Sequence, residues 1–210
     1  MKEGMKKDWL AVWKNYGEVS RGLSIFEQLW EEYNHEDRAY HNIKHIAALL
    51  KEMESCKAFI EDTDSFFFSI WFHDIVYKVL RDNNEELSAL EAQKFLSETS
   101  FSKDRIEKVM RWIRATGRHD DGEENDLNLF LDADLSILGA SAEDYIKYAA
   151  QVRKEYTVAP DIYYNAGRIK VLQHFLHKAR IFTSDFFSDR YEIQANRNVK
   201  QELKQLEVLS

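Results

Sequence analysis

The sequence predicts an all-α fold, and three observations support this prediction. The 210-residue chain has one proline and seven glycines, so it is poor in the residues that form tight turns. Apolar residues recur every three or four positions along most of its length, as they do on the buried face of a helix. It shows no internal repeat, low-complexity segment or convincing strand pattern. We therefore expect about nine or ten helices in a single domain, residues 1–210.

Each expected helix is an apolar stripe bounded by capping or helix-breaking residues. In chain order, the expected helices lie at about residues 9–16, 23–33, 41–60, 66–76, 83–96, 102–116, 127–138, 141–152, 160–176 and 185–209.

Several boundaries follow from local chemistry. Residues 62–65 (Asp-Thr-Asp-Ser) supply N-cap candidates for the apolar helix that follows them. Residues 83–86 (Asn-Asn-Glu-Glu) resemble a capping box, with an acceptor side chain three residues before a glutamate. Gly17 and Gly139 mark helix ends. Residues 118–126 are charged and lack periodicity, so they predict a loop.

Composition excludes several classes of protein. The net charge of −8 argues against a general nucleic-acid-binding surface. Cys56 is the only cysteine, so an internal disulfide is impossible and a reducing compartment is expected. Residues 1–8 lack the apolar run of a signal peptide, and no stretch approaches the roughly 20 apolar residues of a membrane span. We expect a soluble cytoplasmic protein that is a monomer or a homodimer.

A histidine and an aspartate stand side by side within the most apolar run of the chain. His73 and Asp74 lie in a segment, Phe66 to Val76, whose other residues leave almost no polar face. A buried carboxylate costs several kcal/mol unless a charge or a metal compensates it. The pair is therefore either a metal ligand pair or a core hydrogen-bonded pair.

Two further segments carry residues of the metal-ligating types. His41 and His45 are four residues apart, which would place both on one face of a helix; the alternative is that they are solvated or that one caps the helix. Asp132 and Asp134 lie within an apolar helix and point in different directions. We expect Asp134 to face a site and Asp132 to cap or form a salt bridge, although the reverse assignment is open.

Imidazole and carboxylate groups are the ligands of Zn²⁺, Mn²⁺, Fe²⁺ and related divalent ions. A set of two histidines and two aspartates leaves coordination positions for water, and a metal lowers the pKa of such a water enough to make it a nucleophile near neutral pH. The residues therefore predict one divalent ion per chain, with Mn, Fe, Zn, Mg, Co and Ni not distinguished, and a hydrolytic site.

The order of these motifs in an all-α chain resembles the HD superfamily of metal-dependent phosphohydrolases. The segments RAYHNIKHI, FHDIVY, NEELSA, FLDADLSILG and YNAGRIKVL resemble those of a bacterial family of predicted HD-type phosphohydrolases without an assigned substrate. The resemblance covers about residues 33–202. It implies a helical HD-type core at about residues 33–180, with the terminal helices packed on it.

The cyclic-nucleotide phosphodiesterase branch of that superfamily implies specific roles. By position, this resemblance makes His45, His73, Asp74 and Asp134 the metal ligands, and His41 the proton donor. The glutamate of its Asn-x-Glu-Leu motif falls on Glu86, which we count with His41 and Asp74 as a catalytic candidate.

One departure from that branch limits the comparison. Tyr77 stands where the branch has a further histidine. This argues against a tightly held second ion, leaves room for a weaker one, and argues against transferring cyclic-nucleotide specificity.

Candidates for substrate binding are cationic or lie near these motifs. They are Arg38, Lys78, His119 and Arg168. A surface salt bridge to Glu36 or Asp37 is the alternative for Arg38, and a solvated loop position is the alternative for His119.

The resulting hypothesis is metal-dependent hydrolysis of a phosphate ester of a small molecule, such as a nucleotide. The main alternative is a non-catalytic helical module that binds a metal and a nucleotide as a sensor or adaptor. A di-iron oxygenase of the HD type ranks last, because it needs more ligands than the sequence provides.

Overall fold

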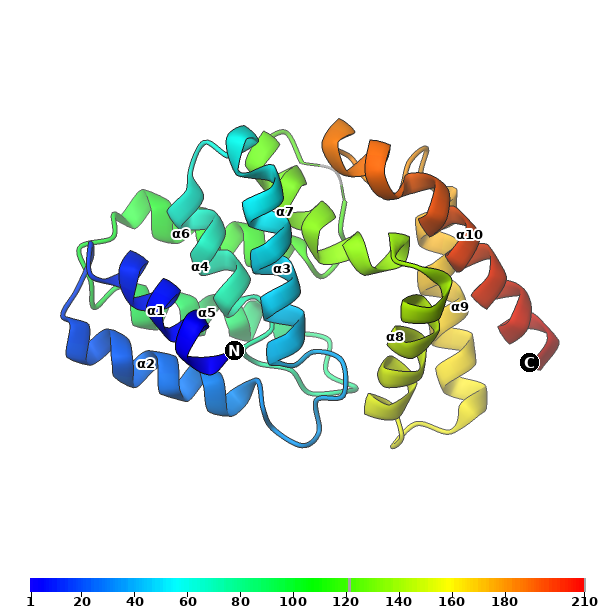
Figure 1. The fold of residues 1–210 in the computed structure, drawn as a ribbon. Helices are drawn as coiled ribbons and strands as arrows, with labels where there is room; N and C mark the ends of the chain where they lie inside the picture. Colours follow the sequence, from blue (N-terminus) through cyan, green and yellow to red (C-terminus); the bar gives the residue numbers. More distant parts are fainter. Residues whose placement is uncertain (121, 210) are drawn as a thin grey trace. The chain divides into compact units, whose positions relative to one another are not determined.

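The computed structural model describes residues 1–120 and 122–209, and its secondary structure confirms the all-α prediction. The described residues form ten α-helices and two short 3₁₀ helices, with no strand among them (Figure 1). None of these helices is long and apolar enough to cross a lipid bilayer. The helices group into two compact units, Met1–Asp120 and Asp121–Ser210, which are described separately.

The first unit contains six of the α-helices. They are α1 (Lys2–Trp13), α2 (Val19–Glu32), α3 (Ile43–Cys56), α4 (Thr63–Phe72), α5 (Asn84–Leu96) and α6 (Lys103–Ala115), and η1 (Lys57–Phe59) follows α3. The second unit contains α7 (Asn125–Leu135), η2 (Ser136–Gly139), α8 (Ala142–Glu155), α9 (Asp161–His177) and α10 (Asp185–Leu209).

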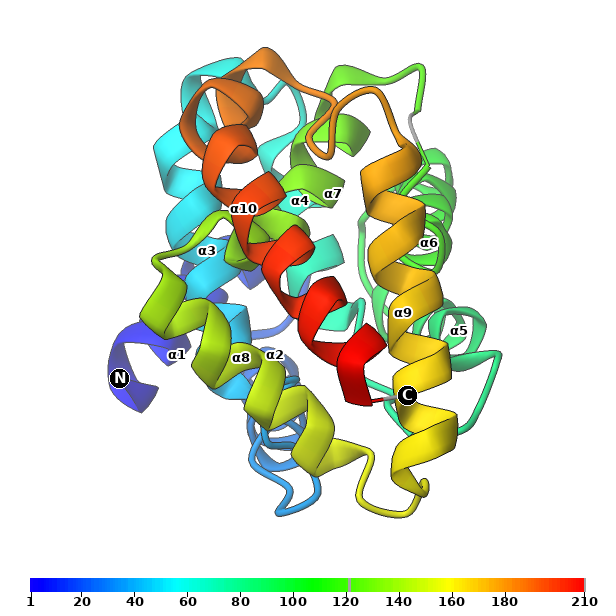
Figure 2. The same ribbon diagram turned by 90° about the vertical axis from the view of Figure 1, so that its right-hand side faces the viewer.

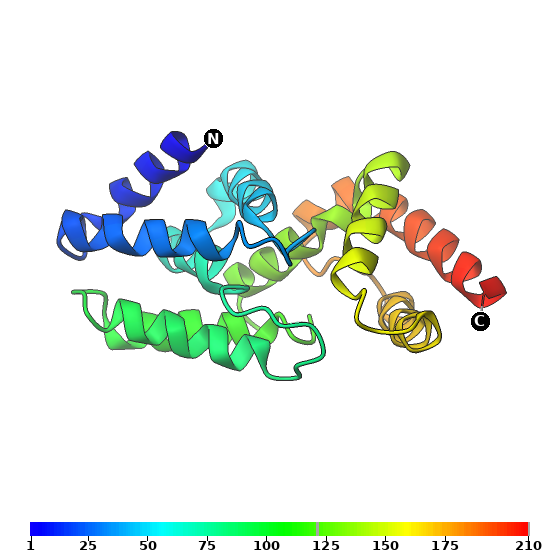
Figure 3. The same cartoon turned by 90° about the horizontal axis from the view of Figure 1, so that it is seen from below.

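Helix α4 lies at the centre of the first unit. Every residue of its last two turns, 65–72, is buried, in agreement with the apolar run of the sequence. The ring of Trp9 on α1 lies within 5.4 Å of the ring of Trp71, measured between centroids, and Phe72 stacks on Phe95 of α5. Helix α6 also packs against α4, and Figure 3 shows α5 and α6 side by side. A helix surrounded in this way has its position fixed by large aromatic contacts.

The N-terminal end of α4 is held by the predicted cap and by a partly buried ion pair. Asp62 accepts a hydrogen bond from the backbone N–H of Ser65 at 3.1 Å, and its carboxylate also pairs with Arg105 and Lys108 of α6. Burial alone would raise the pKa of Asp62, but the hydrogen bonds from Arg105 and Ser65 outweigh burial and hold that pKa well below its usual range. The start of α4 therefore depends on an ionised carboxylate.

Two predicted helix boundaries near the histidines were wrong. Helix α4 ends at Phe72, so His73 is its C-cap and Asp74 lies beyond it. Helix α3 begins at Ile43 after the N-cap Asn42, so His41 precedes the helix. The Asn42 side chain accepts from the N–H of Lys44 at 2.8 Å, and this cap sets the start of the helix.

The predicted capping box at residues 83–86 was also wrong in its side-chain contacts. Asn83 is the N-cap residue of α5 but makes no side-chain cap hydrogen bond. Glu86 instead forms a bidentate pair with Arg114 of α6, at 2.6 and 2.9 Å. A charge-assisted bidentate pair is stronger than the reciprocal bond of a capping box, so the tertiary partner prevails.

In the second unit, α10 packs against α8, α9 and η2, and Figure 2 shows it lying between α8 and α9. The Asn198 side chain on α10 donates to the carbonyls of Leu138 and Ala140 at 2.8 and 2.9 Å. A Cβ atom at Gly139 would lie 2.5 Å from the Cβ of Tyr191, so only glycine permits this approach.

We expect Asp62→Asn to lower the free energy of unfolding by about 1–3 kcal/mol at pH 7, because asparagine keeps the cap but loses the charge. The pKa of Asp62 is depressed in the folded state, so this contribution is complete above the unfolded pKa and is lost as pH falls through the folded value. The difference between the two proteins should therefore shrink below about pH 4. Urea unfolding at several pH values measures it.

Asp104→Asn is the matched control, since Asp104 is an exposed carboxylate in the first turn of α6. It should change stability by no more than about 0.5 kcal/mol. A difference for Asp62→Asn that stays constant down to pH 2 would contradict the assignment.

Candidate metal centre

Three potential metal ligands converge in the first unit. His45 Nε2 lies 3.2 Å from His73 Nε2 and 3.8 Å from Asp74 Oδ2, and the latter two atoms are 3.2 Å apart. Both histidine side chains are almost fully buried, at 3% and 1% exposure, and the Asp74 side chain is 16% exposed. Within the described part of the chain, this is the one group of three or more His, Cys, Asp or Glu residues placed to hold an ion.

The packing of α3 against α4 brings the ligands together (Figure 1). His45 lies in the first turn of α3, and His73 caps the C-terminal end of α4. Tyr33 links the two: its backbone carbonyl accepts from the N–H of Ile43 at 2.9 Å, and its hydroxyl donates to the carbonyl of Trp71 at 3.0 Å. The start of α3 and the end of α4 are thus fixed to the same residue.

Hydrogen bonding fixes the tautomer of His73. Its Nδ1 lies 2.9 Å from the backbone carbonyl oxygen of Ile70. A carbonyl oxygen can only accept, so Nδ1 carries the proton and Nε2 presents its lone pair toward His45 and Asp74. This is the usual arrangement of a metal-ligating histidine, in which the second ring nitrogen donates to a carbonyl or carboxylate.

The donor set and its spacing suit a divalent ion. Metal–nitrogen bonds of about 2.0–2.1 Å in a tetrahedral site separate neighbouring ligand atoms by about 3.3 Å, close to the 3.2 Å between the two histidine Nε2 atoms. His73 and Asp74 also lie at the C-terminal end of α4, where the helix dipole favours a cation, whereas His45 lies in the first turn of α3. These residues could therefore hold a divalent metal ion.

His41 lies beside this cluster although it is outside the helix. Its ring centroid is 5.9 Å from that of His45, so the expected neighbourhood holds while the shared helix face does not. Its ring stacks on Tyr77 with centroids 4.2 Å apart and planes 28° from parallel. Tyr77 stands where the cyclic-nucleotide phosphodiesterase branch has a further histidine. In this chain its ring packs against His41.

Arg38 occupies a buried position in the same region. Its guanidinium donates to three backbone carbonyls, those of His41, Asp74 and Ile75, at 2.7–3.1 Å. The alternative of a surface salt bridge to Glu36 or Asp37 does not hold, since the side chain is buried on the backbone of the site. Its predicted contact with a substrate phosphate is not favoured by this geometry.

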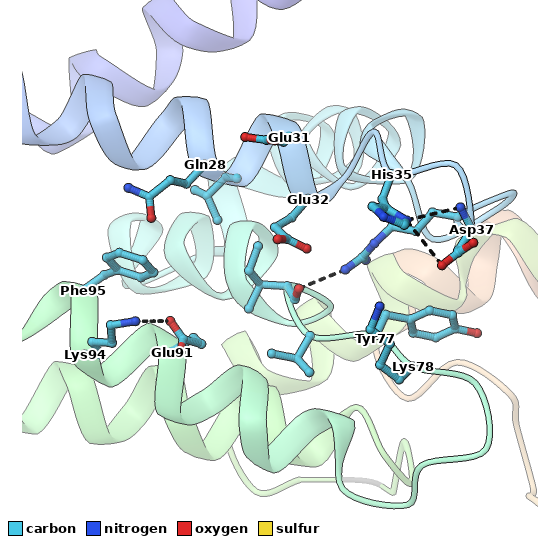
Figure 4. A pocket seen from close by; sticks show the side chains of 14 residues that line it. Gln28, Glu31, Glu32, His35, Asp37, Tyr77, Lys78, Glu91, Lys94 and Phe95 are labelled. Atoms are coloured by element: carbon cyan, nitrogen blue, oxygen red, sulfur yellow. Dashed lines mark hydrogen bonds and ion pairs between the residues drawn. The ribbon is translucent and has the colours of Figure 1, made fainter.

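The remaining candidates of the first unit lie in more open positions. Lys78 is exposed and lies with Tyr77 at one end of a pocket of about 370 Å³, with Lys94 and Phe95 at the other end (Figure 4). Glu86 is exposed, and its pairing with Arg114 lowers its pKa. His119 has a left-handed backbone conformation, with φ of 51°, in the turn after α6. Their catalytic and substrate-binding roles stay predictions.

In the second unit, the two aspartates of α7 have different surroundings. Asp132 is buried and accepts from the N–H of Thr183 at 2.9 Å and from the N–H and hydroxyl of Ser184 at 2.7 and 2.5 Å. Burial raises its pKa, against the effect of these hydrogen bonds. This is the capping role expected for one of the two aspartates, so the ligand prediction rests on Asp134, which is half-buried.

Arg168 is buried in the second unit by a bidentate pair. Its guanidinium donates to Glu202 at 2.8 and 3.0 Å and to the hydroxyl of Tyr148 at 3.2 Å. A phosphate would have to displace Glu202 to use the same donors, so this geometry does not favour substrate binding by Arg168.

Tyr33, Tyr77 and the backbone role of Arg38 were not anticipated from the sequence. No local pattern identifies a hydroxyl that donates to a carbonyl 38 residues away, or an arginine side chain that donates to a carbonyl 37 residues away. The only available signal was that Arg38 and Tyr77 stand next to the histidine motifs.

Substitutions of the two aspartates of α7 should have different effects on stability and on metal binding. Asp132→Asn should lower the free energy of unfolding by about 2–3 kcal/mol, because the amide nitrogen cannot accept from Thr183 or Ser184, and should leave the affinity for Co²⁺ unchanged. Asp134→Asn should weaken Co²⁺ binding by roughly tenfold or more. Calorimetric titration and urea unfolding measure both quantities. The reverse pattern would make Asp132 the ligand.

Comparison with known proteins assigns no family to the chain. No protein-family model matches it, and neither a curated protein nor a solved structure gives a match. The case for a metal centre therefore rests on the three converging ligand atoms, their burial and the tautomer of His73.

Proposed function

We propose that this protein hydrolyses a phosphate ester of a small molecule, using a divalent ion held by His45, His73 and Asp74. The observation that carries the proposal is the convergence of these three ligand atoms in a buried position. Asp134 remains the fourth ligand of the sequence-based prediction. The resemblance of the motifs to the HD superfamily supports the same reaction class.

A divalent ion in this position supplies an acidified water and polarises a phosphoryl oxygen. The chain itself supplies the orientation. Ile70 fixes the tautomer of His73, and the packing of α3 against α4 holds His45. The burial of both imidazoles keeps bulk water from competing for their lone pairs.

His41 is the proposed general acid. It lies next to His45 and is half-buried, so a substrate can reach it. Stacking on Tyr77 restrains the ring and holds it near the ligands. In this position, a protonated imidazole donates its proton to the leaving oxygen of the ester.

One exposed cation close in sequence to the ligands supports a phosphorylated substrate. Lys78 lies four residues after Asp74 and is exposed, so its ammonium group is available to a phosphate. A small phosphorylated molecule, such as a nucleotide, supplies both an anionic group for the ion and a leaving oxygen for His41. We rank nucleotides first among the substrates to be tested.

The proposal is tested by measuring phosphate release from a panel of phosphomonoesters and diesters, nucleotides included, with Mn²⁺, Co²⁺, Zn²⁺, Mg²⁺, Ni²⁺ and Fe²⁺ added in turn. We expect at least one ester to be hydrolysed in a metal-dependent manner, with His45→Asn losing both metal and activity. Stoichiometric metal binding and nucleotide binding without hydrolysis of any ester would indicate the non-catalytic sensor or adaptor instead.

The role of His41 makes a sharper prediction with the substrate found in that panel. His41→Asn should reduce turnover by about 10²–10⁴, because general acid catalysis contributes this much, and should leave metal content at the wild-type level. The defect should be smaller for a nitrophenyl ester, whose leaving group needs little protonation. His177→Asn, which replaces an exposed histidine of the second unit, is the control and should match the wild type.

Two outcomes would contradict this role. If His41→Asn strips the metal as completely as His45→Asn does, His41 is a ligand. If turnover is unchanged with a poor leaving group, His41 transfers no proton, and His119 becomes the candidate.

A further inference from the structure

We infer that Arg38 is a positioning residue that fixes the backbone on both sides of the metal centre, rather than a group that binds the substrate phosphate. The Arg38 guanidinium donates three hydrogen bonds that support this role. One guanidinium nitrogen, Nη1, donates to the carbonyl of His41 at 3.1 Å and to that of Asp74 at 2.7 Å. The other, Nη2, donates to the carbonyl of Ile75 at 2.9 Å.

These acceptors belong to the two segments that carry the site. Residues 73–75 follow the last turn of α4 and include two ligands, while residue 41 precedes the N-cap of α3 and its ligand His45. The carbonyls of His41, Asp74 and Ile75 lie outside the α-helices, so no helical ladder orients their backbone. Arg38 joins the two irregular segments and lies 36 residues before Asp74 in the sequence.

The surroundings of Arg38 are those of a structural cation. Its exposed fraction is 8%, and among the described residues its partners are the three carbonyls and two aromatic rings. The guanidinium carbon lies 5.0 Å from the ring centroid of Tyr33 and 5.8 Å from that of Tyr77. Burying a charge is costly unless hydrogen bonds compensate it, and charge-assisted bonds to carbonyls with cation–π contacts do so.

The same two rings connect Arg38 to the residues of the site. Tyr33 donates its hydroxyl to the carbonyl of Trp71, two residues before His73. Tyr77 stacks on the ring of His41. Removing the guanidinium therefore releases the backbone of Asp74 directly and loosens the support of His41 through Tyr77.

Only the planar fork of arginine satisfies this geometry. Its five N–H donors lie in one plane and reach three acceptors on two segments at once. The ammonium group of lysine is a single point with three donors on a flexible stem, and it cannot reach all three carbonyls from the same place. Charge alone should therefore fail to maintain the metal site, whereas an arginine that only bound the substrate phosphate could be replaced without any change in metal affinity.

The inference rests on the metal site of the proposed function, and its test is the dissociation constant of Co²⁺, measured by calorimetric titration without any substrate. We expect Arg38→Met to weaken Co²⁺ binding about 10- to 100-fold, the range found when groups that orient metal ligands are removed. Arg38→Lys should be weakened by a similar factor, because it keeps the charge but not the fork.

Arg105→Met is the matched control. Arg105 is also a partly buried arginine of the first unit and anchors α4, but at its N-terminal end through Asp62. This variant should lose stability comparably and keep the wild-type affinity for Co²⁺. The titrations are run at a temperature at which circular dichroism shows each protein to be folded.

Each outcome decides a different question. A wild-type protein that binds no divalent ion would overturn the proposed function itself. Wild-type affinity for Co²⁺ in both Arg38→Met and Arg38→Lys, together with a raised KM, would overturn the positioning role and make Arg38 a phosphate ligand. If both Arg38 variants fail to fold while Arg105→Met folds, Arg38 supports the whole unit rather than the site, and the inference is wrong.

Discussion

Two imidazole nitrogens and a carboxylate oxygen lie within 3.8 Å of one another, largely shielded from water, where the start of α3 meets the C-terminal end of α4. Lone pairs at this distance repel unless a proton or a metal ion lies between them. The tautomer of His73 places its proton on Nδ1, away from the cluster, and the dipole of α4 favours a cation beside His73 and Asp74. A proton or a metal ion must therefore compensate these lone pairs, and the rest of the site depends on this requirement.

The first unit meets this constraint by fixing both ends of α4. At the N-terminal end, Arg105 pairs with the capping carboxylate of Asp62. Beyond the C-terminal end, Arg38 holds the carbonyls of Asp74 and Ile75. Between them the helix is locked by large aromatic contacts on several sides. The rigid helix allows ligands from two segments to keep a spacing suited to one ion.

The predictions that succeeded depend on local physics. Helical periodicity gave the fold class, and Asp62, Ser102 and Ser141 cap the helices they were expected to begin. Polar residues in apolar surroundings correctly marked His45, His73 and Asp74 as a group that could hold an ion. These signals need only the residues within a few positions of each other, or the cost of burying a charge.

The predictions that failed depend on partners distant in sequence. Glu86 matched a local capping pattern, but Arg114, 28 residues away, takes its carboxylate. His41 was placed on a helix because the spacing suited one, whereas the cap at Asn42 starts the helix later. Arg38 donates to the carbonyl of Asp74, 36 residues away, and no local pattern predicted that contact. A tertiary hydrogen bond overrides a local preference of similar or smaller energy.

X-ray absorption spectroscopy of the Co²⁺-loaded protein tests the central claim most directly, together with the number of ions bound per chain. The structure predicts one ion per chain, with a first coordination shell of nitrogen and oxygen that includes two imidazoles, and loss of one imidazole in His73→Ala. A spectrum with only oxygen ligands, or one that His73→Ala leaves unchanged, would contradict the account, because the ion would then be bound elsewhere.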